Sequence, residues 1–372
     1  MTSTRGASGG DAGPSHSRIV GREAGVTNCF DISPDGERGA AGYEDGSVRV
    51  FDLASGEVLS TRTVAGSDIL VVRFSPDGSR LAASSLFDEV IMLESNTLDD
   101  VWRVKEEGTA SGPMVFSGDS LVCSTHDDDG VSTRNAVTGE LTARVASNTY
   151  CVVAADGRVF AEYLDLSSVR VASVTTGETL HVFASSVEPA TQDLGPLTKE
   201  RLDDMGRRVH SFRLSDDGGY AAIITCANML TVCDLSTGRS AFSREMMTTD
   251  CFHFLPGRRF VWTPDRTCEM ELRDLESRCR GARFKRDDLD MVFPTGLFVS
   301  PDGTVAVVRA LLCDLSKAGE YRARAWDLES GTCLFTEPGI DVSHEFLFSR
   351  DGRRALSGKR DGLIRVWTIT GE

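Results

Sequence analysis

The chain repeats one short turn motif eight times, and this repetition constrains its fold more than any other feature. In the clearest copies an apolar residue precedes Ser, a variable residue, Asp and Gly, at residues 30–36, 73–78, 298–303 and 347–352. Weaker copies lie at residues 115–119, 153–157, 213–218 and 254–257. Successive motifs are 38 to 49 residues apart, except for one interval of 61 residues. Because a period of about 40 residues with turn signals is typical of repeated β-sheet units, we expect an all-β repeat fold.

The first repeat indicates that each unit contains four short strands. Pro34, Asp35 and Gly36 predict a tight turn, because proline restricts φ and glycine tolerates positive φ. Further turn signals at residues 44–46 and 54–57 separate stretches in which apolar and polar residues largely alternate. The pattern therefore predicts strands at residues 29–33, 39–43, 47–53 and 58–64.

Short motifs in the third strand of several units indicate the repeat type. Trp326-Asp327, Phe51-Asp52 and Cys233-Asp234 occupy equivalent positions, and residues 361–367 read Asp-Gly-Leu-Ile-Arg-Val-Trp. From residue 18 onward, this pattern resembles the WD-repeat family. The resemblance implies a β-propeller of four-stranded blades, a fold with which WD-repeat proteins generally present surfaces to other proteins.

One family feature is missing from every unit. WD repeats carry a Gly-His pair before the first strand, and its His joins an Asp, a Ser or Thr and the Trp in a hydrogen-bonded tetrad. No unit of this chain keeps the Gly-His pair, and two units keep Trp in the third strand. We therefore expect the blades to be held together mainly by apolar packing between neighbouring sheets.

The repeat count predicts an eight-bladed ring, with seven blades as the alternative if the third or fourth unit is not a blade. The eighth unit ends after its third strand, at residues 363–369. Residues 18–20 are strand-like and are expected to supply the missing fourth strand, which removes the open edges of the ring. The expected organisation is a disordered tail at residues 1–17 and a single propeller at residues 18–372, with insertions at residues 185–208 and 310–320.

Charge and cysteine content restrict the expected partners and compartment. Lys and Arg number 40 against 56 Asp and Glu, and the resulting charge of −16 disfavours binding to nucleic acid and anionic membranes. No apolar run is long enough to span a membrane, and residues 1–17 lack the apolar stretch of a secretory signal. The ten cysteines form no C-x-x-C pair, so we expect reduced thiols, no zinc site, no cofactor and a cytoplasmic protein.

Candidate partner-binding residues come from the loops on one face of the ring, where the second strand joins the third and the fourth joins the next unit. Both insertions belong to this face, and residues 185–208 contain a short helix candidate. Its apolar residues are Leu197, Leu202 and Met205; the acidic turn residues are Glu44, Asp88, Asp128, Asp165 and Asp265; the aromatic residues near the turns are Tyr43 and Phe87. Each set also has a simpler explanation, because long surface loops cost little closure entropy and acidic turn residues favour solubility.

No catalytic motif of the types G-x-S-x-G, H-E-x-x-H or strand-linked G-x-G-x-x-G is present. His126 and the neighbouring Asp127, Asp128 and Asp129 have the side chains of metal ligands, but adjacent residues on one turn rarely converge on one ion. The sequence therefore favours a non-enzymatic protein–protein interaction scaffold that is monomeric within a complex. The alternatives are a hydrolase or isomerase with carboxylates or a metal at the channel mouth, and a peptide or modified-residue reader with an aromatic cage.

Overall fold

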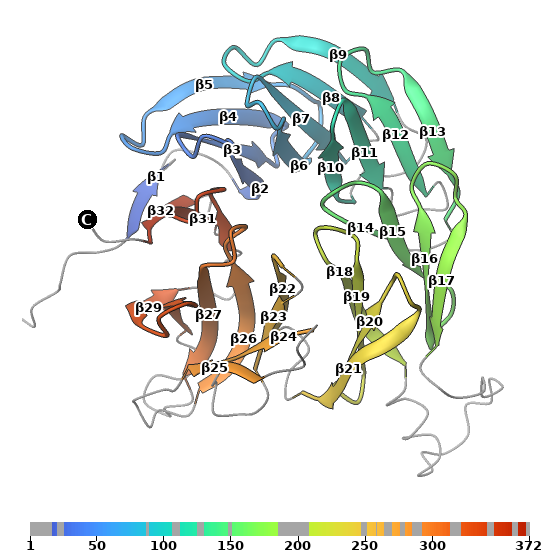
Figure 1. Ribbon diagram of the computed structural model, residues 1–372. Helices are drawn as coiled ribbons and strands as arrows, with labels where there is room; N and C mark the ends of the chain where they lie inside the picture. The colour runs from blue at the N-terminus through green and yellow to red at the C-terminus, as the bar shows by residue number, and fades with distance from the viewer. Residues whose placement is uncertain are drawn as a thin grey trace, which may run out of the picture.

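The strands of the protein form a ring of four-stranded antiparallel sheets. A computed structural model describes residues 17–20, 26–86, 89–105, 112–124, 130–147, 151–184, 208–246, 251–257, 259–263, 270–275, 280–284, 292–312, 321–340, 346–358 and 364–369. The described residues form eight such sheets arranged around a central axis (Figure 1). The fold is an eight-bladed β-propeller, which confirms the larger of the two predicted blade numbers.

The blades are numbered in chain order, and each runs from an inner first strand to an outer fourth strand. Blades 1 to 4 consist of β2(Thr27–Ile32), β3(Arg38–Tyr43), β4(Ser47–Asp52), β5(Val58–Thr63); β6(Ile69–Phe74), β7(Arg80–Ser85), β8(Glu89–Glu94), β9(Asp100–Lys105); β10(Met114–Ser117), β11(Ser120–Ser124), β12(Val131–Asn135), β13(Leu141–Val145); and β14(Cys151–Val153), β15(Val159–Tyr163), β16(Ser168–Ser173), β17(Thr179–Ala184).

Blades 5 to 8 follow the same order, and the last blade takes its outer strand from the start of the chain. They consist of β18(Val209–Leu214), β19(Tyr220–Thr225), β20(Met229–Asp234), β21(Arg239–Glu245); β22(Phe252–Leu255), β23(Arg259–Trp262), β24(Met270–Asp274), β25(Arg280–Phe284); β26(Val292–Val299), β27(Val305–Leu312), β28(Tyr321–Asp327), β29(Cys333–Ile340); and β30(Phe346–Phe348), β31(Arg354–Gly358), β32(Ile364–Thr368), β1(Ser17–Val20).

The amino-terminal strand closes the ring. β1 pairs antiparallel with β32, from Ser17 opposite Trp367 to Val20 opposite Ile364. Figure 1 shows β1 beside β32, next to the first blade. Residues from the two ends of the described chain therefore share one sheet, as the sequence predicted, and β32 has a hydrogen-bonded neighbour on both sides.

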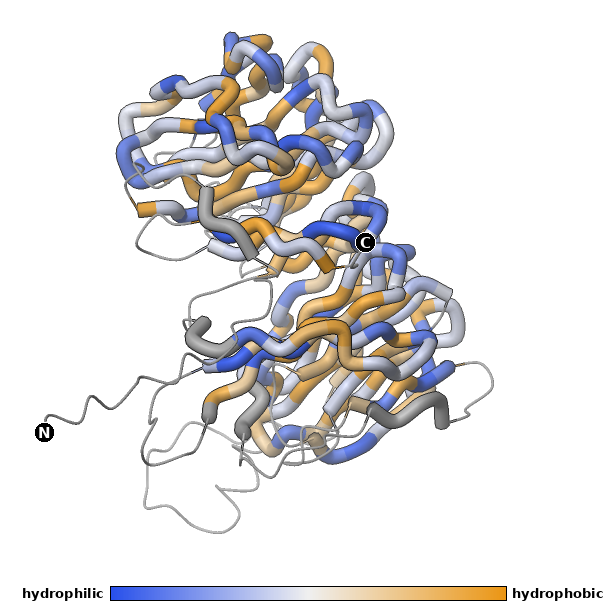
Figure 2. Tube along the Cα trace, turned by 90° about the vertical axis from the view of Figure 1, so that its left-hand side faces the viewer, coloured by the Kyte–Doolittle hydropathy of each residue, from blue (hydrophilic) through white to orange (hydrophobic). Residues whose placement is uncertain are grey.

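Apolar packing joins each blade to the next. The buried hydrophobic residues form eight clusters, and each cluster draws its members from two neighbouring blades. At the closing junction, Tyr43 and Phe51 of blade 1 pack with Leu356, Ile364 and Val366 of blade 8. Figure 2 shows hydrophobic stretches along the strands and hydrophilic residues at many of the turns. This packing agrees with the expectation that the blades cohere without complete polar tetrads.

A remnant of the polar tetrad survives in blade 8. The indole N–H of Trp367 in the third strand donates to the Ser357 hydroxyl in the second strand, at 2.8 Å. Both side chains are fully buried. A buried indole N–H needs such a partner, because leaving it unpaired costs about 1–3 kcal/mol.

The Ser-x-Asp-Gly motif folds into the same hydrogen-bonded turn in five blades. In blade 2 the Ser75 hydroxyl donates to the Asp77 carboxylate (2.6 Å) and accepts from the backbone N–H of Arg80 (2.9 Å). Gly78, at φ 71°, donates its N–H to the Ser75 carbonyl at 2.8 Å. The hydroxyl accepts a backbone N–H in the same way at Ser33, Ser215, Ser300 and Ser349. The motif therefore forms a hydrogen-bonded turn that connects the first strand of a blade to the second.

We expect this turn to make stability fall in acid. The Ser75 hydroxyl, together with the Ser79 backbone N–H and hydroxyl, lowers the pKa of Asp77 below its ordinary value. A lowered folded-state pKa stabilises the fold above the unfolded-state pKa of about 3.9, and this contribution is lost as the pH falls through the folded value. Asp77→Asn keeps an acceptor oxygen but cannot titrate, so the urea midpoint of this variant should fall less between pH 5 and pH 2 (about the range that spans both values) than that of wild type. An equal fall in both proteins would contradict this assignment.

Blade 7 has longer inner strands than expected. Its second strand, β27, continues through Leu312, and Ala310 and Leu311 pair with Arg322 and Tyr321 of β28. The first residues of the predicted 310–320 insertion are therefore strand residues, because the ladder between β27 and β28 continues through them. Residues 313–320 lie outside the described residues, as do 1–16 of the predicted tail and 185–207 of the other predicted insertion.

Candidate interaction face

Loops from all blades gather on two opposite faces of the ring. Since the strands of each blade are antiparallel, the turns between second and third strands lie on the same face as the links to the next blade. We call this face the upper face; the turns between first and second strands and between third and fourth strands lie on the lower face. The predicted partner-binding residues that the structure describes, Tyr43, Glu44 and Asp165, belong to or lie beside upper-face turns.

In blade 4 an upper-face turn exposes two leucines. Leu164 is 56% exposed and Leu166 is 62% exposed, and they flank Asp165. The Asp165 carboxylate accepts hydrogen bonds from the backbone N–H of Ser167 (2.7 Å) and from its hydroxyl (2.9 Å). The Leu164 N–H donates to the Ser168 carbonyl at 3.0 Å. The turn therefore holds its apolar side chains outward through its own hydrogen bonds.

The same turn is also tied to blade 5. The Val209 N–H donates to the Leu166 carbonyl at 2.8 Å, and the Tyr163 hydroxyl donates to the His210 carbonyl at 3.0 Å. The Tyr163 ring packs edge-on against Phe212 with 4.8 Å between ring centroids. These contacts fix the Leu164–Leu166 turn relative to the next blade, so that its position does not depend on one hairpin alone.

The structure places the predicted residues of blade 1 in two different environments. Glu44 and Asp45 are exposed at the upper-face turn, where the Ser47 hydroxyl and backbone N–H lower the pKa of Asp45. Tyr43 is 1% exposed and lies inside the junction with blade 8, with the Arg49 guanidinium 5.0 Å from its ring centroid. Burial raises the pKa of Tyr43. Its ring therefore faces the core, and the acidic pair beside it faces solvent.

Of the remaining predicted residues, Asp165 is described, and it is exposed between the two leucines. The others lie outside the described residues: Leu197, Leu202, Met205, Asp88, Phe87, Asp128 and Asp265, together with His126. Their partner-binding role stays a prediction. The sequence reasoning missed Leu164 and Leu166; the signal that could have found them is an apolar residue on each side of Asp165, where a turn normally carries polar residues.

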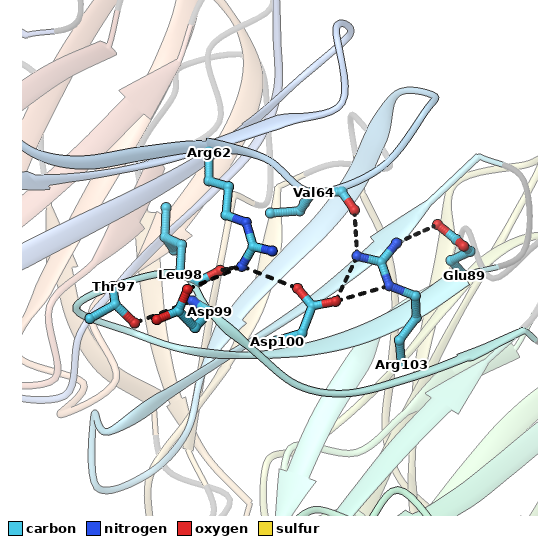
Figure 3. Close-up of polar contacts among 8 residues, drawn as sticks. All are labelled: Arg62, Val64, Glu89, Thr97, Leu98, Asp99, Asp100 and Arg103. Carbon is cyan, nitrogen blue, oxygen red and sulfur yellow. Dashed lines mark hydrogen bonds and ion pairs between the residues drawn. The ribbon is translucent and has the colours of Figure 1, made fainter.

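A cluster of charged residues, called here the polar clip, joins the first two blades (Figure 3). Arg62 of β5 contacts Asp99 (3.5 Å) and Asp100 (3.3 Å) and donates to the Leu98 carbonyl at 2.6 Å. Arg103 of β9 bridges Asp100 (2.9 Å), Glu89 (3.2 Å) and the carbonyl of Val64 (2.8 Å). Every carboxylate in the clip has an arginine partner. The cluster therefore holds two blades together and leaves no unpaired carboxylate for a ligand.

The inner strands carry titratable groups with shifted pKa values, but these groups also make structural contacts. Burial raises the pKa of Asp31 in β2, whose carboxylate accepts the backbone N–H of Phe74 (2.7 Å) and lies 3.9 Å from Arg73. Burial lowers the pKa of His253 in β22, whose Nδ1 lies 2.6 Å from the carbonyl of Phe254. The two groups belong to blades 1 and 6, and Asp31 links blade 1 to blade 2.

Among the described residues, no three His, Cys, Asp or Glu side chains come close enough together to hold a metal ion. Over the same residues, no helix has the length and hydropathy needed to cross a bilayer.

Two protein families match the repeat pattern. The family model described as "Outer membrane protein assembly factor BamB" matches residues 44–249, more than half of the chain. The model described as "WD domain, G-beta repeat" matches residues 14–52 and 331–368, at the junction where the ring closes. These two segments include all four strands of blade 8, the outer strand of blade 7 and the first three strands of blade 1.

Similar proteins include the Angio-associated migratory cell protein of Canis lupus familiaris, 31% identical over 94 residues, and that of Homo sapiens, 30% identical over 94 residues. Each alignment covers 24% of this chain and 22% of the relative, so the match spans about a fifth of the relatives' length.

Several solved structures share the fold. The computationally designed Ika8 protein has a TM-score of 0.69 at 14% identity, covering 94% of this chain and 98% of that chain. BamB from Moraxella catarrhalis (0.62, 15% identity) and Sqt1 from Saccharomyces cerevisiae (0.64, 12% identity) each cover 95% of this chain and are covered to 98%. At these identities the likeness shows the propeller fold alone.

Proposed function

The chain belongs to the family described as "Outer membrane protein assembly factor BamB", whose model matches residues 44–249, and it carries WD repeats at residues 14–52 and 331–368; from this premise we propose that it is a non-enzymatic scaffold that binds other proteins. The observation that carries the proposal is the blade 4 turn, where Leu164 and Leu166 are more than half exposed on a turn fixed by hydrogen bonds. When a partner covers exposed apolar side chains, the free energy of the complex falls by about 25 cal/mol per Å² of apolar surface buried. A WD-repeat ring with such a turn on its upper face is suited to protein binding.

Two further features support this face as the binding surface. Met229 of blade 5 and Leu86 of blade 2 are large apolar residues that are also exposed next to upper-face turns. Acidic residues accompany them, with Glu44 and Asp45 in blade 1 and Asp165 in blade 4. A partner with apolar anchors and a basic rim would complement this surface.

The proposal predicts that charges at the blade 4 turn abolish partner binding and leave the fold intact. We expect the double variant Leu164→Asp/Leu166→Asp to keep the wild-type melting temperature, because neither side chain belongs to a buried cluster. Partner capture should fall by about tenfold or more, since burying two carboxylates at an apolar contact is costly. Quantitative affinity capture from cell extract, combined with a photo-crosslinking residue at position 165, measures the loss and identifies the contacting protein.

Val137 provides the matched control. It is 56% exposed, as Leu164 is, but it lies in a lower-face turn of blade 3. Val137→Asp should capture the same partner as wild type, and a crosslinker at position 137 should not reach it. Equal loss in both variants would mean that the charge acts non-specifically, and wild-type capture by the Leu164→Asp/Leu166→Asp protein would refute the proposed face.

The cytoplasmic location and the monomeric state within a complex are part of the same proposal. Seven described cysteines carry free thiols, and four of them are buried. Burial raises the pKa of Cys29 to about 12 and that of Cys151 to about 11, so these thiols stay protonated and inert. Free thiols in such number are typical of proteins in a reducing compartment.

A further inference from the structure

One outer strand of the ring lacks the residues that usually protect the edge of a sheet. An outer strand has one unpaired backbone edge, and proteins protect such edges with charged residues or proline. The sequences of seven of the eight outer strands contain such residues: Arg62 in β5, Asp100, Arg103 and Lys105 in β9, Arg144 in β13, Arg239, Arg244 and Glu245 in β21, Arg280 and Arg283 in β25, Glu337 and Pro338 in β29, and Arg18 in β1. The exception is β17 of blade 4. Its sequence, Thr-Leu-His-Val-Phe-Ala, contains no Lys, Arg, Asp, Glu or Pro.

The two faces of β17 have different environments. Leu180 is 43% exposed and Val182 is 50% exposed, and alternation along the strand puts both on the same face as Ala184. On the other face, His181 stacks on Phe183 with 5.6 Å between centroids, and Phe183 packs against the cluster shared by blades 4 and 5. The strand is therefore anchored on one side and apolar and open on the other.

The edge of β17 is also free among the described strands. Blade 4 has the order β14-β15-β16-β17, and β17 pairs with β16 alone in the described part of the chain. The ribbon view places β17 at the outside of the ring (Figure 1). A strand in this position can form main-chain hydrogen bonds with a further strand, which is the basis of β-augmentation.

The upper end of β17 reaches the proposed interaction face. Ala184 pairs with Ser168, and Ser168 directly follows the turn that exposes Leu164 and Leu166. Four of the ten large apolar residues that are exposed in the described chain belong to blade 4, two on the turn and two on β17. The exposed apolar residues of blade 4 therefore lie on β17 and on the turn beside its upper end.

We propose that β17 accepts an extended segment of a partner protein as the fifth strand of blade 4. This inference rests on the proposed scaffold function and names how one partner docks. The segment carries apolar or β-branched residues at alternate positions, to pack on Leu180 and Val182, and basic residues at its two ends. The basic ends follow from charge complementarity, because exposed Glu178 precedes β17 and exposed Asp165 lies on the turn beside its last residue.

The overall charge argues against a second copy of this chain as the occupant. Each copy carries −16, so two copies repel each other, and a paired β17 brings no basic residue to Glu178 or Asp165. A basic-ended strand from another protein meets both acidic residues and the uncharged centre of the edge.

The test uses the full chain and a synthetic peptide, acetyl-Lys-Thr-Val-Thr-Val-Thr-Val-Lys-amide, with an N-methylated version that cannot form the ladder as its control. We expect the peptide to bind and to slow hydrogen exchange at the β17 amides, and the N-methylated peptide to do neither. Leu180→Lys should weaken binding by about tenfold or more, because a charge at the edge opposes strand pairing and repels the basic ends.

Leu59→Lys is the matched control variant. Leu59 occupies the equivalent position in β5, as shown by the pairing of Ser60 with Val50 and of His181 with Val171, and it is 53% exposed. This variant should bind the peptide as wild type does, and both variants should keep the wild-type melting temperature.

The proposal is overturned by a lack of peptide binding to wild type, by binding that Leu180→Lys leaves unchanged, or by exchange protection that maps away from β17. Wild-type dimers in sedimentation that disappear in Leu180→Lys would assign the edge to self-association instead, and would equally overturn it. The outcome is separable from that of the scaffold test. If Leu164→Asp/Leu166→Asp loses its partner while the peptide fails to bind wild type, the upper face is supported as the binding surface and strand docking on β17 is refuted.

Discussion

A chain that begins at residue 21 should be markedly less stable than the full protein and should aggregate on heating. Removing β1 breaks four residue pairs with β32 and exposes the edge of a sheet that contains the buried Trp367. At about 1 kcal/mol per lost hydrogen bond, the loss amounts to roughly 3–4 kcal/mol before any effect on ring closure. Urea denaturation followed by far-ultraviolet circular dichroism measures the loss, and light scattering reports aggregation through the open edge.

A chain that begins at residue 17 is the control for this truncation, because it keeps every residue of β1. We expect its urea midpoint to equal that of the full chain. If both truncations behaved alike, β1 would contribute nothing to closure, and the role of the amino-terminal strand would have to be abandoned.

Trp367→Ala should lower the free energy of unfolding by about 3–5 kcal/mol, the range for removing a large buried aromatic side chain. The side chain is fully buried and stacks on Phe335 with 5.8 Å between ring centroids. Its ring centroid lies 5.3 Å from that of Phe346. Its indole N–H is bonded to Ser357, so truncation leaves a cavity and also a buried hydroxyl without this partner. Trp367 belongs to the buried cluster that joins blade 7 to blade 8.

Two variants separate the sources of this loss. Trp367→Phe keeps most of the apolar volume but removes the hydrogen bond, and should cost an intermediate amount of about 1–3 kcal/mol. Trp102→Ala removes a half-buried indole from the outer strand β9, where the ring N–H is bonded to the Ala136 carbonyl at 3.0 Å, and should cost less than Trp367→Ala. Guanidinium unfolding monitored at two wavelengths measures all three variants. A cost below about 1 kcal/mol for Trp367→Ala would contradict the packing between blades 7 and 8.

The candidate site was predicted only in part, and the reason lies in the range of the interactions. Asp165 and Glu44 were expected on the upper face and are exposed there, because turn chemistry places them within a few residues of their own strand ends. Tyr43 was grouped with them by position. Its ring lies in the core instead, because blade 8, which is more than 300 residues away in the chain, packs against it. The exposure of Leu180 and Val182 depends on the same kind of packing between blades.

The amino-acid sequence by itself determined the repeat, the four strands of the first blade to within two residues at each end, the larger of the two blade numbers it left open, and the strand that closes the ring. Each of these follows from local chemistry: proline and glycine at turns, a serine that bonds an aspartate two residues later, and alternation along short strands. The tertiary structure alone decided which aromatic rings are buried between blades and which apolar side chains stay in solvent at the Leu164–Leu166 turn and along β17. Burial depends on the side chains that neighbouring blades bring into contact, and no period or motif within one repeat encodes that contact.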